Sequence, residues 1–213
     1  MQAIIDRIRF PLIGWFYALN PGRIGSRKVL PFYLNHHRLQ GEGAELGVQR
    51  GLFSEHLLRY WKGGVLHCID PWLHFDPTEY AEKKDNVSEQ THETYHAETV
   101  ARLKKFGARA QIHRATSRQA AAAFADGSLD FVFIDAQHHY DAVKEDIDLW
   151  HPKIKTGGLL CGHDWLLDYG PPRYGVRKAV MEFAEQTSRK ILVSADKSTW
   201  FIPLHKETSA QQV

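Results

Sequence analysis

Four residues in the first third of the chain have the types and spacing to hold a nucleoside cofactor. Glu45, Gly47 and Gly51 lie in the segment GAELGVQRG, and Asp70 ends the run LHCID that follows about one helix later. Glycine lets a backbone approach a ligand closely because it has no Cβ, and a carboxylate ending the next strand can accept both ribose hydroxyls. The pattern predicts an adenosine-type cofactor beyond a strand–helix–strand unit.

The glycine turn reads E-x-G-x-x-x-G and lacks the third glycine of G-x-G-x-x-G. That third glycine helps to bring a pyrophosphate onto a helix N-terminus, so a dinucleotide is disfavoured. An ordinary tight turn remains the plain alternative for Gly47 and Gly51.

A second group of chemistry-bearing residues follows two later apolar runs. Asp135 and His138 come after LDFVFI, and His163 and Asp164 come after GGLLCG. If both runs are parallel strands, their carboxyl ends meet at one edge of a sheet. Carboxylates beside imidazoles suit general-base chemistry or a divalent ion. In isolation, His138 could simply begin the next helix and Asp164 could cap a helix or turn.

The glycine turn resembles motif I of class I S-adenosylmethionine-dependent methyltransferases. The later blocks, I-D-x-x-H-x-Y from Ile134 and G-G-x-x-x-G-H-D-W from Gly157, resemble the bacterial family that includes the macrocin and cephalosporin-pathway O-methyltransferases. The resemblance covers about residues 43–203 and leaves the N-terminal segment uncovered. It implies methyl transfer from S-adenosylmethionine to a hydroxyl of a small molecule, with a sugar or glycosylated metabolite as the expected acceptor.

The resemblance also assigns cofactor-binding roles, to Glu45, Gly47, Gly51, Asp70, Trp72, Ser117 and Asp135. The glycine turn would surround the methionine end, Asp70 would bind the ribose, and Trp72 and Ser117 would flank adenine. Two alternatives stay open. Trp72 could be a core aromatic, and Ser117 could cap the helix that follows it.

Methyl transfer to a hydroxyl needs a base or a metal to prepare the acceptor. Related families hold Mg²⁺ at these strand ends, which points to Asp135, His163 and Asp164 here. His163 stands where several relatives have an acid, and imidazole is a poor Mg²⁺ ligand, so an ion that tolerates nitrogen, such as Mn²⁺, is the better match. In the alternative mechanism His138 takes the acceptor proton while Asp135 or Asp164 orients its ring.

The elements that must position these residues alternate regularly from residue 43 onward, which is typical of a parallel sheet covered on both faces. We expect strands at Ala44–Leu46, Val65–Asp70, Gln111–Arg114, Phe131–Asp135, Leu159–Gly162, Ile191–Ser194 and Thr199–Pro203. We expect helices at Leu52–Trp61, Thr91–Phe106, Ser117–Phe124, Tyr140–Trp150 and Gly175–Gln186. The fold class is therefore α/β: a Rossmann-like, seven-stranded, mostly parallel doubly wound sheet closed by an antiparallel hairpin.

The chain of 213 residues has room for one core. We expect residues 1–42 to form an extension of helix and loop that serves as a lid or oligomer contact, 43–205 the cofactor-binding domain, and 206–213 a polar tail. Within the extension, residues 10–19 are apolar and have basic residues around them, so contact with a membrane surface is one expectation, and a cap on the core or on a partner subunit is the stronger alternative.

Charge and cysteine content narrow the class of partner. A formal net charge of +2, from 27 basic and 25 acidic residues, gives no reason to expect nucleic acid. The two cysteines fall in apolar strands, and no stretch is apolar for long enough to span a bilayer, so we expect a cytoplasmic protein. Such enzymes are commonly homo-oligomers, which we also expect here.

Two other functions remain as alternatives. The protein could N-methylate an amino sugar, or it could be an inactive cofactor-binding subunit that pairs with an active methyltransferase, with Trp15, Phe16 and Tyr17 at the contact. The polar groups at the strand ends favour an active enzyme.

Overall fold

The computed structural model describes residues 25–76, 85–166 and 175–205. The expected membrane-surface or partner segment at 10–19 and the tail at 206–213 lie outside these residues. Across the described ranges, no helix has both the length and the hydropathy that crossing a bilayer requires.

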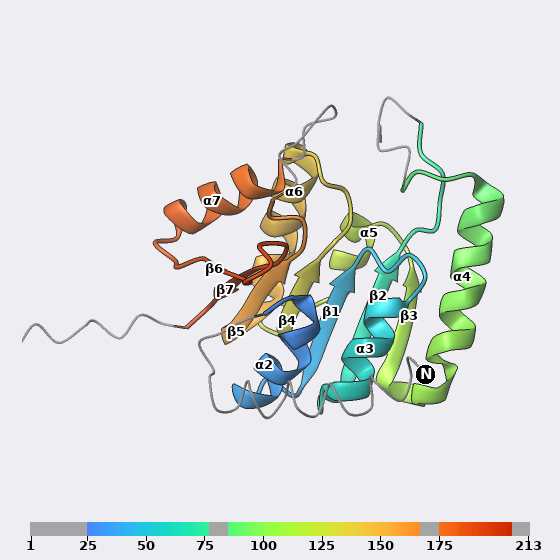
Figure 1. Ribbon diagram of the computed structural model, residues 1–213, viewed down its shortest axis with the longest axis horizontal. Coiled ribbons are helices and arrows are strands. Elements are labelled where there is room, and N and C mark those ends of the chain that lie inside the picture. The colour runs from blue at the N-terminus through green and yellow to red at the C-terminus, as the bar shows by residue number, and fades with distance from the viewer. Residues whose placement is uncertain (1–24, 77–84, 167–174, 206–213) are drawn as a thin grey trace, which may run out of the picture.

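A seven-stranded sheet in the order β3-β2-β1-β4-β5-β7-β6 forms the middle layer (Figure 1). Its strands are β1 (Glu42–Leu46), β2 (Val65–Asp70), β3 (Ala110–Arg114), β4 (Leu129–Ile134), β5 (Ile154–Gly162), β6 (Leu192–Val193) and β7 (Trp200–Pro203). The first five strands are parallel, and β7 pairs antiparallel with both β5 and β6. The expected fold class, a mostly parallel Rossmann-like sheet with an antiparallel hairpin, is confirmed.

Helices cover both faces of the sheet. One face carries α2 (Leu30–His36), α3 (Leu52–Tyr60) and α4 (Glu89–Leu103), and the other carries α5 (Ser117–Ala121), α6 (Tyr140–Trp150) and α7 (Val176–Gln186). Short 3₁₀ turns adjoin three of these helices: η1 (Arg27–Val29) precedes α2, η2 (Lys104–Arg109) follows α4, and η3 (His151–Lys153) follows α6. The five expected helices are present, and their ends differ slightly from those expected. For example, α4 begins at Glu89 and α5 ends at Ala121.

The central strand β4 shows why this sequence builds a two-sided core. Its residues LDFVFI are buried without interruption, as expected for a strand covered on both faces. Phe131 and Phe133 point into the α2–α3–α4 side, while Val132 and Ile134 point into the α5–α6–α7 side.

Helix α2 lies in the N-terminal extension, for which helix and loop were expected without bounds, and it belongs to the core. Leu30 and Leu34 are fully buried, and Tyr33 packs on Phe201 of β7 with ring centroids 6.0 Å apart. Asn35 also ties the helix to α3, because its side-chain amide donates to the carbonyl oxygen of Tyr60 at 2.8 Å. The described part of the N-terminal segment is therefore packed into the same body as the sheet.

The strand order places a topological switch point between β1 and β4. The chain proceeds from β1 through β2 to β3 in one direction and from β4 to β5 in the other. The loops that leave β1 and β4 therefore separate at their carboxyl ends, and ligands of open α/β sheets bind in the crevice formed there.

Candidate active site

A cavity of about 590 Å³ lies at this crevice, a size suited to a small-molecule ligand. Residues from the carboxyl ends of β1, β2, β4 and β5 line it, together with the first residues of α5 and side chains of α6. It includes most of the expected site residues, namely Glu45, Gly47, Asp70, Ser117, Asp135, His138, His163 and Asp164.

The turn after β1 is fixed by glycine geometry. Gly47 has φ of 84°, and a Cβ there would lie 2.0 Å from the carbonyl oxygen of Asp135. Gly51 has φ of 68° and precedes α3 as its N-cap. Glycine is therefore required at position 47 for packing as well as for close approach of a ligand, because it lets the chain leaving β1 pass directly beside the end of β4.

Asp70 holds the same turn from the neighbouring strand. Its Oδ2 accepts from the backbone N–H groups of Val48 (3.0 Å) and Gln49 (2.8 Å), and its Oδ1 accepts from that of Trp72 (2.7 Å). Burial raises the pKa of Asp70, and these N–H bonds oppose that shift. A carboxylate has about four acceptor positions, so three bonds leave capacity for a ribose hydroxyl.

Trp72 lies in the core and is not among the residues that line the cavity. Its side chain is fully buried, and its indole N–H donates to the carbonyl oxygen of Gln49 at 2.7 Å. This position corrects the expectation that Trp72 flanks adenine and agrees with the alternative of a core aromatic. Burial of the large ring stabilises the far side of the glycine turn.

Ser117 does line the cavity, but it does not cap α5. The cap is Thr116, whose hydroxyl accepts from the N–H of Gln119 while the Gln119 side chain accepts from the N–H of Thr116. The Ser117 hydroxyl instead accepts from the indole N–H of Trp150 at 2.7 Å. The serine is thereby held at the start of α5, at the wall of the cavity.

Glu45 is buried beneath the cavity, with 1% of its surface exposed. The Ser54 hydroxyl donates to its Oε2 at 2.6 Å. Burial raises the pKa of Glu45 to about 8, although the Ser54 hydrogen bond acts in the other direction. The carboxyl group is therefore largely protonated near neutral pH unless a ligand brings a positive charge to it.

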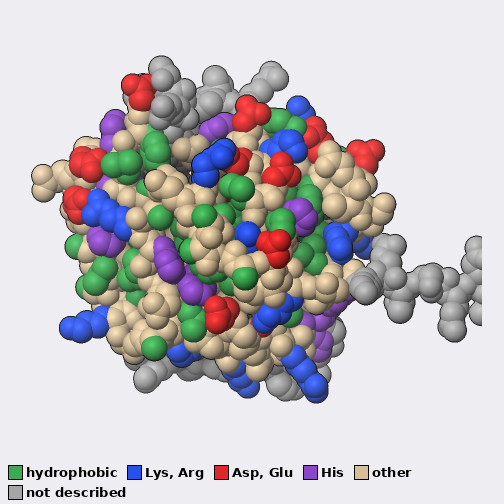
Figure 2. Space-filling view, turned by 180° about the vertical axis from the view of Figure 1, so that it is seen from behind, with side chains coloured by type: hydrophobic (Ala, Val, Ile, Leu, Met, Phe, Trp, Pro, Cys, Tyr) green, Lys and Arg blue, Asp and Glu red, His purple; other side chains and the backbone are tan. Residues whose placement is uncertain are grey.

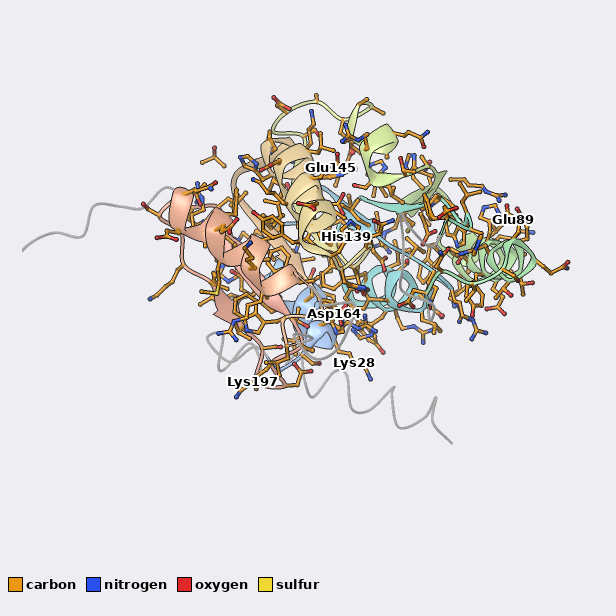
Figure 3. The ribbon with its side chains drawn as sticks, turned by 90° about the horizontal axis from the view of Figure 1, so that it is seen from above. Lys28, Glu89, His139, Glu145, Asp164 and Lys197 are labelled. Carbon is orange, nitrogen blue, oxygen red and sulfur yellow. The ribbon has the colours of Figure 1, made fainter. Side chains whose placement is uncertain are left out.

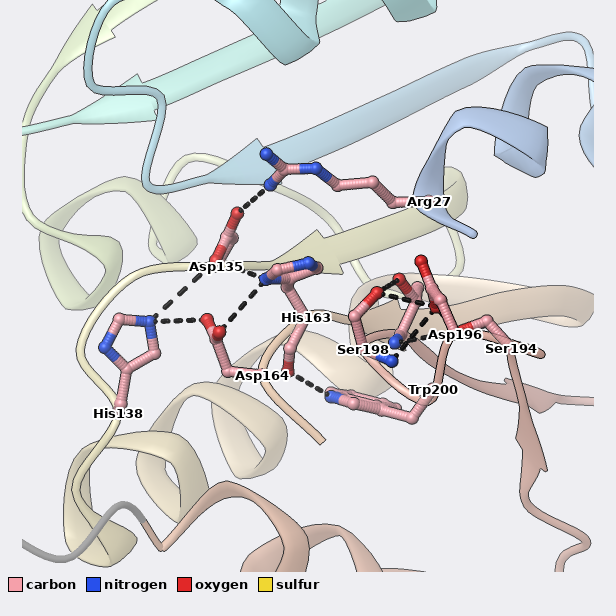
Figure 4. A network of polar contacts seen from close by, with 10 residues as sticks. Arg27, Asp135, His138, His163, Asp164, Ser194, Asp196, Ser198 and Trp200 are labelled. Carbon is pink, nitrogen blue, oxygen red and sulfur yellow. Dashed lines mark hydrogen bonds and ion pairs between the residues drawn. The ribbon is translucent and has the colours of Figure 1, made fainter. Parts of the chain in front are cut away.

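Two carboxylates and two imidazoles converge at the ends of β4 and β5, and we call Asp135, His138, His163 and Asp164 the acid–imidazole centre (Figure 4). Asp164 bridges the two rings, with His138 Nε2 at 2.9 Å from Oδ2 and His163 Nδ1 at 3.1 Å from Oδ1. Both ring nitrogens also lie 3.8 Å from Oδ1 of Asp135. Residues from two strand ends are thus brought within reach of one another.

Backbone contacts hold the centre in place. The N–H of His163 donates to the carbonyl oxygen of Ile134 (3.0 Å), and the N–H of Gly175 donates to that of His138 (2.7 Å). Asp164 has φ of 59°, a left-handed conformation that aspartate tolerates better than most residues. Viewed from above, Asp164 lies between α6 and α2 (Figure 3).

The pKa values of the two carboxyl groups of the centre are shifted in opposite directions. Burial raises the pKa of Asp135 despite its contacts with His138 and His163. Burial acts on Asp164 in the same direction, but hydrogen bonds from His138 and His163 outweigh it and hold its pKa below the usual range. Asp164 is therefore the carboxylate that stabilises a positive charge on either ring.

The geometry favours a different metal-ligand set from the expected Asp135, His163 and Asp164. Ligand atoms of Asp135, His138 and Asp164 all lie within 4.8 Å of one another. Two oxygens and one nitrogen suit Mn²⁺, Fe²⁺ or Zn²⁺ better than Mg²⁺. These residues fit a divalent ion, and His138 stands in this set where the expected set has His163.

Arg27 is a site residue that sequence reasoning missed. Its Nη1 lies 2.9 Å from Oδ2 of Asp135, although the two residues are 108 positions apart. Arg27 precedes every recognised motif, and no local pattern marks it. Only the packing of α2 could have revealed this contact.

The face of the molecule in Figure 2 shows lysine and arginine scattered among acidic side chains. Among the residues coloured there, no basic stripe of the kind that follows a nucleic acid backbone is visible. The cavity therefore remains the feature most suited to a ligand.

Comparison with solved structures shows the same fold in several bacterial proteins. A structural-genomics protein from Corynebacterium glutamicum superposes with a TM-score of 0.63 at 14% identity, covering 98% of this chain and 97% of that one. The O-methyltransferase TomG from Streptomyces achromogenes, involved in tomaymycin synthesis and solved with S-adenosylmethionine, gives 0.58 at 15% identity, covering 84% and 79%. An O-methyltransferase from Bacillus cereus, in complex with S-adenosylhomocysteine, gives 0.56 at 10% identity, covering 94% and 96%.

Among curated protein sequences none matches this chain. A family model described as a methyltransferase domain, that of the methyltransferase 24 family, matches residues 44–165. The matched range begins in β1 and ends directly after the acid–imidazole centre, so it includes the glycine turn, Asp70 and both strand-end acids. The chain therefore belongs to the methyltransferase 24 family.

Proposed function

We propose that this protein transfers a methyl group from S-adenosylmethionine to a hydroxyl of a small molecule. The observation that carries the proposal is the position of the acid–imidazole centre in the same cavity as the glycine turn. A methyl donor in the turn and a hydroxyl at the centre would then meet inside one cavity.

In this proposal the cofactor lies along the edge formed by β1, β2 and the start of α5. Gly47 and Gly51 shape the turn around its methionine end, and Glu45 lies beneath it. Asp70 takes a ribose hydroxyl with its remaining acceptor capacity, and Ser117 borders the adenine. TomG and the Bacillus cereus enzyme hold the methyl donor or its product on the same fold, which supports this choice of cofactor.

The acceptor hydroxyl lies at the centre and gives its proton to the imidazole of His138. The imidazolium that forms is 2.9 Å from Asp164 and 3.8 Å from Asp135, so both carboxylates stabilise its charge. The hydroxyl oxygen forms its bond to the methyl carbon as the carbon–sulfur bond breaks. The bonding pair returns to sulfur and leaves a neutral thioether.

Asp135, His138 and Asp164 would hold a divalent ion if one binds, with His163 beside them. Such an ion would supply Lewis acidity that lowers the pKa of the acceptor hydroxyl. The residues themselves act in either case by orienting the acceptor and stabilising positive charge near Asp164.

The proposed acceptor is a sugar or a glycosylated metabolite, a choice that rests on the resemblance of the strand-end blocks to the macrocin and cephalosporin-pathway enzymes. We also propose that the protein works in the cytoplasm and as a homo-oligomer. The N-terminal segment forms a lid or subunit contact in this proposal.

The proposal is tested by calorimetric titration with S-adenosylmethionine, before and after treatment with EDTA and with Mn²⁺ or Mg²⁺ added back. Micromolar binding is expected, followed by transfer of labelled methyl to one class in a panel of hydroxylated sugars. A matched panel of amino sugars separates O-methylation from N-methylation. Absence of cofactor binding under every condition would overturn the proposal and favour a partner subunit.

A further inference from the structure

Arg27 reaches the acid–imidazole centre from outside the range that the family model matches. The guanidinium Nη1 lies 2.9 Å from Oδ2 of Asp135, and the guanidinium carbon lies 5.1 Å above the centre of the Phe53 ring. Its side chain is 37% exposed, so it forms part of the cavity wall rather than the core. The contact therefore places a permanent positive charge at the edge of the site.

The two oxygens of Asp135 face different partners. Oδ2 is paired with Arg27, whereas Oδ1 lies 3.8 Å from nitrogens of both His138 and His163 (Figure 4). A divalent ion at this centre would take an oxygen of Asp135 while the guanidinium remained close to the same carboxylate. Two positive groups sharing one carboxylate repel each other, and the repulsion is strong where water is limited.

The net charge of the centre also indicates that Arg27 opposes the binding of a divalent ion. Asp135 and Asp164 carry two negative charges, and Arg27 neutralises one of them when the imidazoles are neutral. Hard and borderline divalent ions bind best to sites with uncompensated carboxylates. Arg27 therefore provides one of the two positive charges that such an ion would bring.

The segment that carries Arg27 is held firmly in place. The Ser26 hydroxyl accepts from the N–H of Lys28, and the carbonyl oxygen of Lys28 contacts Nε2 of His56 at 2.8 Å. Val29 and Leu30 are buried directly behind it. The guanidinium is thus positioned by a packed segment, and moving this segment away from the site would break its contact with His56 of α3.

We propose that Arg27 is a tethered cation of the acid–imidazole centre, which occupies Asp135 and weakens the binding of a divalent ion there. Packing of residues 25–30 beside the centre and binding of a divalent ion at Asp135 then oppose one another. The inference shares its centre with the proposed function but does not depend on the acceptor or on methyl transfer.

Metal affinity tests this role directly. Mn²⁺ binding is measured by calorimetry and by the electron paramagnetic resonance signal of free Mn²⁺, for the wild type, Arg27→Met, Arg27→Lys and Lys28→Met. We expect Arg27→Met to bind Mn²⁺ about tenfold more tightly than the wild type or better, because one repulsive charge is removed. Arg27→Lys, which keeps the charge, should stay within about threefold of the wild type.

Lys28→Met is the matched control because it removes the same charge one residue away, from an exposed side chain. Its affinity for Mn²⁺ should equal that of the wild type. In the Arg27→Met background, Asp135→Asn should abolish the gain, which places the ion at this centre. Thermal unfolding of each variant confirms that it is folded before titration.

The inference is overturned if Arg27→Met binds Mn²⁺ no more tightly than the wild type, if it binds none, or if Lys28→Met gains as much. Because the measurement uses the metal alone, a failure here leaves the cofactor and transfer experiments unaffected. Failure of methyl transfer with the expected Mn²⁺ result would instead reject the proposed function and leave the role of Arg27 standing.

Discussion

The glycine turn and the acid–imidazole centre share one cavity but are built in different ways. The turn is held by backbone geometry, because Gly47 passes beside Asp135 and the N–H groups of Val48 and Gln49 bind Asp70. The centre is held by side-chain charges from η1 and from the loops that follow β4 and β5.

This difference predicts different responses to change. The turn should tolerate few alterations of shape, since its conformation depends on a missing Cβ at Gly47 and on the positive φ angles of Gly47, Gln49 and Gly51. Isosteric substitutions in the centre should leave the protein folded but reduce its activity, because these side chains act through charge and proton transfer. Four predictions test the contrast, from the largest expected effect to the smallest.

Gly47→Ala should have the largest effect on folding. The new Cβ would lie 2.0 Å from a backbone oxygen at φ of 84°, so a loss of roughly 4 kcal/mol or more in unfolding free energy is expected. Gly127→Ala is the matched control, because Gly127 also has positive φ but has nothing within 4 Å of the added Cβ. It should cost only about 1 kcal/mol in the same denaturant titration. Equal losses would show that the close approach to β4 does not matter.

His138→Gln should affect chemistry with little effect on folding. Glutamine keeps hydrogen-bonding ability but cannot take a proton near neutral pH, so kcat should fall by about 10²–10⁴-fold. The affinity for S-adenosylmethionine should change by less than about threefold, because His138 faces the acceptor. His139→Gln, one residue along the chain, is the control and should retain activity. Full activity of His138→Gln would remove His138 from the proposed mechanism.

Glu45 should make the stability of the protein depend on pH. Its pKa rises from an ordinary value of 4.5 to about 8 on folding, so its contribution is complete below pH 4.5 and is lost as pH rises toward 8. The stability of the wild type should therefore decline relative to Glu45→Gln between pH 5 and pH 8.5, by an amount on the order of 4 kcal/mol. Chemical denaturation of both proteins across this range measures the difference. Parallel curves would mean that Glu45 ionises normally.

Asp70→Asn should have a smaller effect, confined to the turn and its ligand. An amide offers one acceptor oxygen where the carboxylate offers two, so the N–H groups of Val48, Gln49 and Trp72 cannot all be satisfied. We expect S-adenosylmethionine to bind about tenfold more weakly by calorimetry. Asp126→Asn, whose side chain is 73% exposed, serves as the control and should bind normally. Unchanged binding by Asp70→Asn would argue against a ribose contact.

The periodicity of the sequence determined most of the fold, because each strand from β1 to β5 is a short apolar run between glycine-bearing or polar turns. It could not give the bounds of α2, since Leu30–His36 is too short for a helical pattern to emerge and has a proline as its second residue. The burial of that helix depends on β7 and α3, which are distant in the chain.

The candidate site divides in the same way. The glycine turn, Asp70 and the strand-end residues could be identified from the sequence, because parallel strands bring their carboxyl ends to one edge. The choice of Thr116 rather than Ser117 as the cap of α5 could not, since both neighbours are suitable and only the hydrogen bonds distinguish them.

The sequence by itself determined the sheet, the crevice and the residue types at its edge, because these follow from local periodicity and turn chemistry. The tertiary structure decided which groups meet. It buried Trp72 in the core, turned His138 toward Asp164, and brought Arg27 to Asp135 across 108 positions. Contacts of that kind depend on how separate elements pack, and no local pattern in the chain records them.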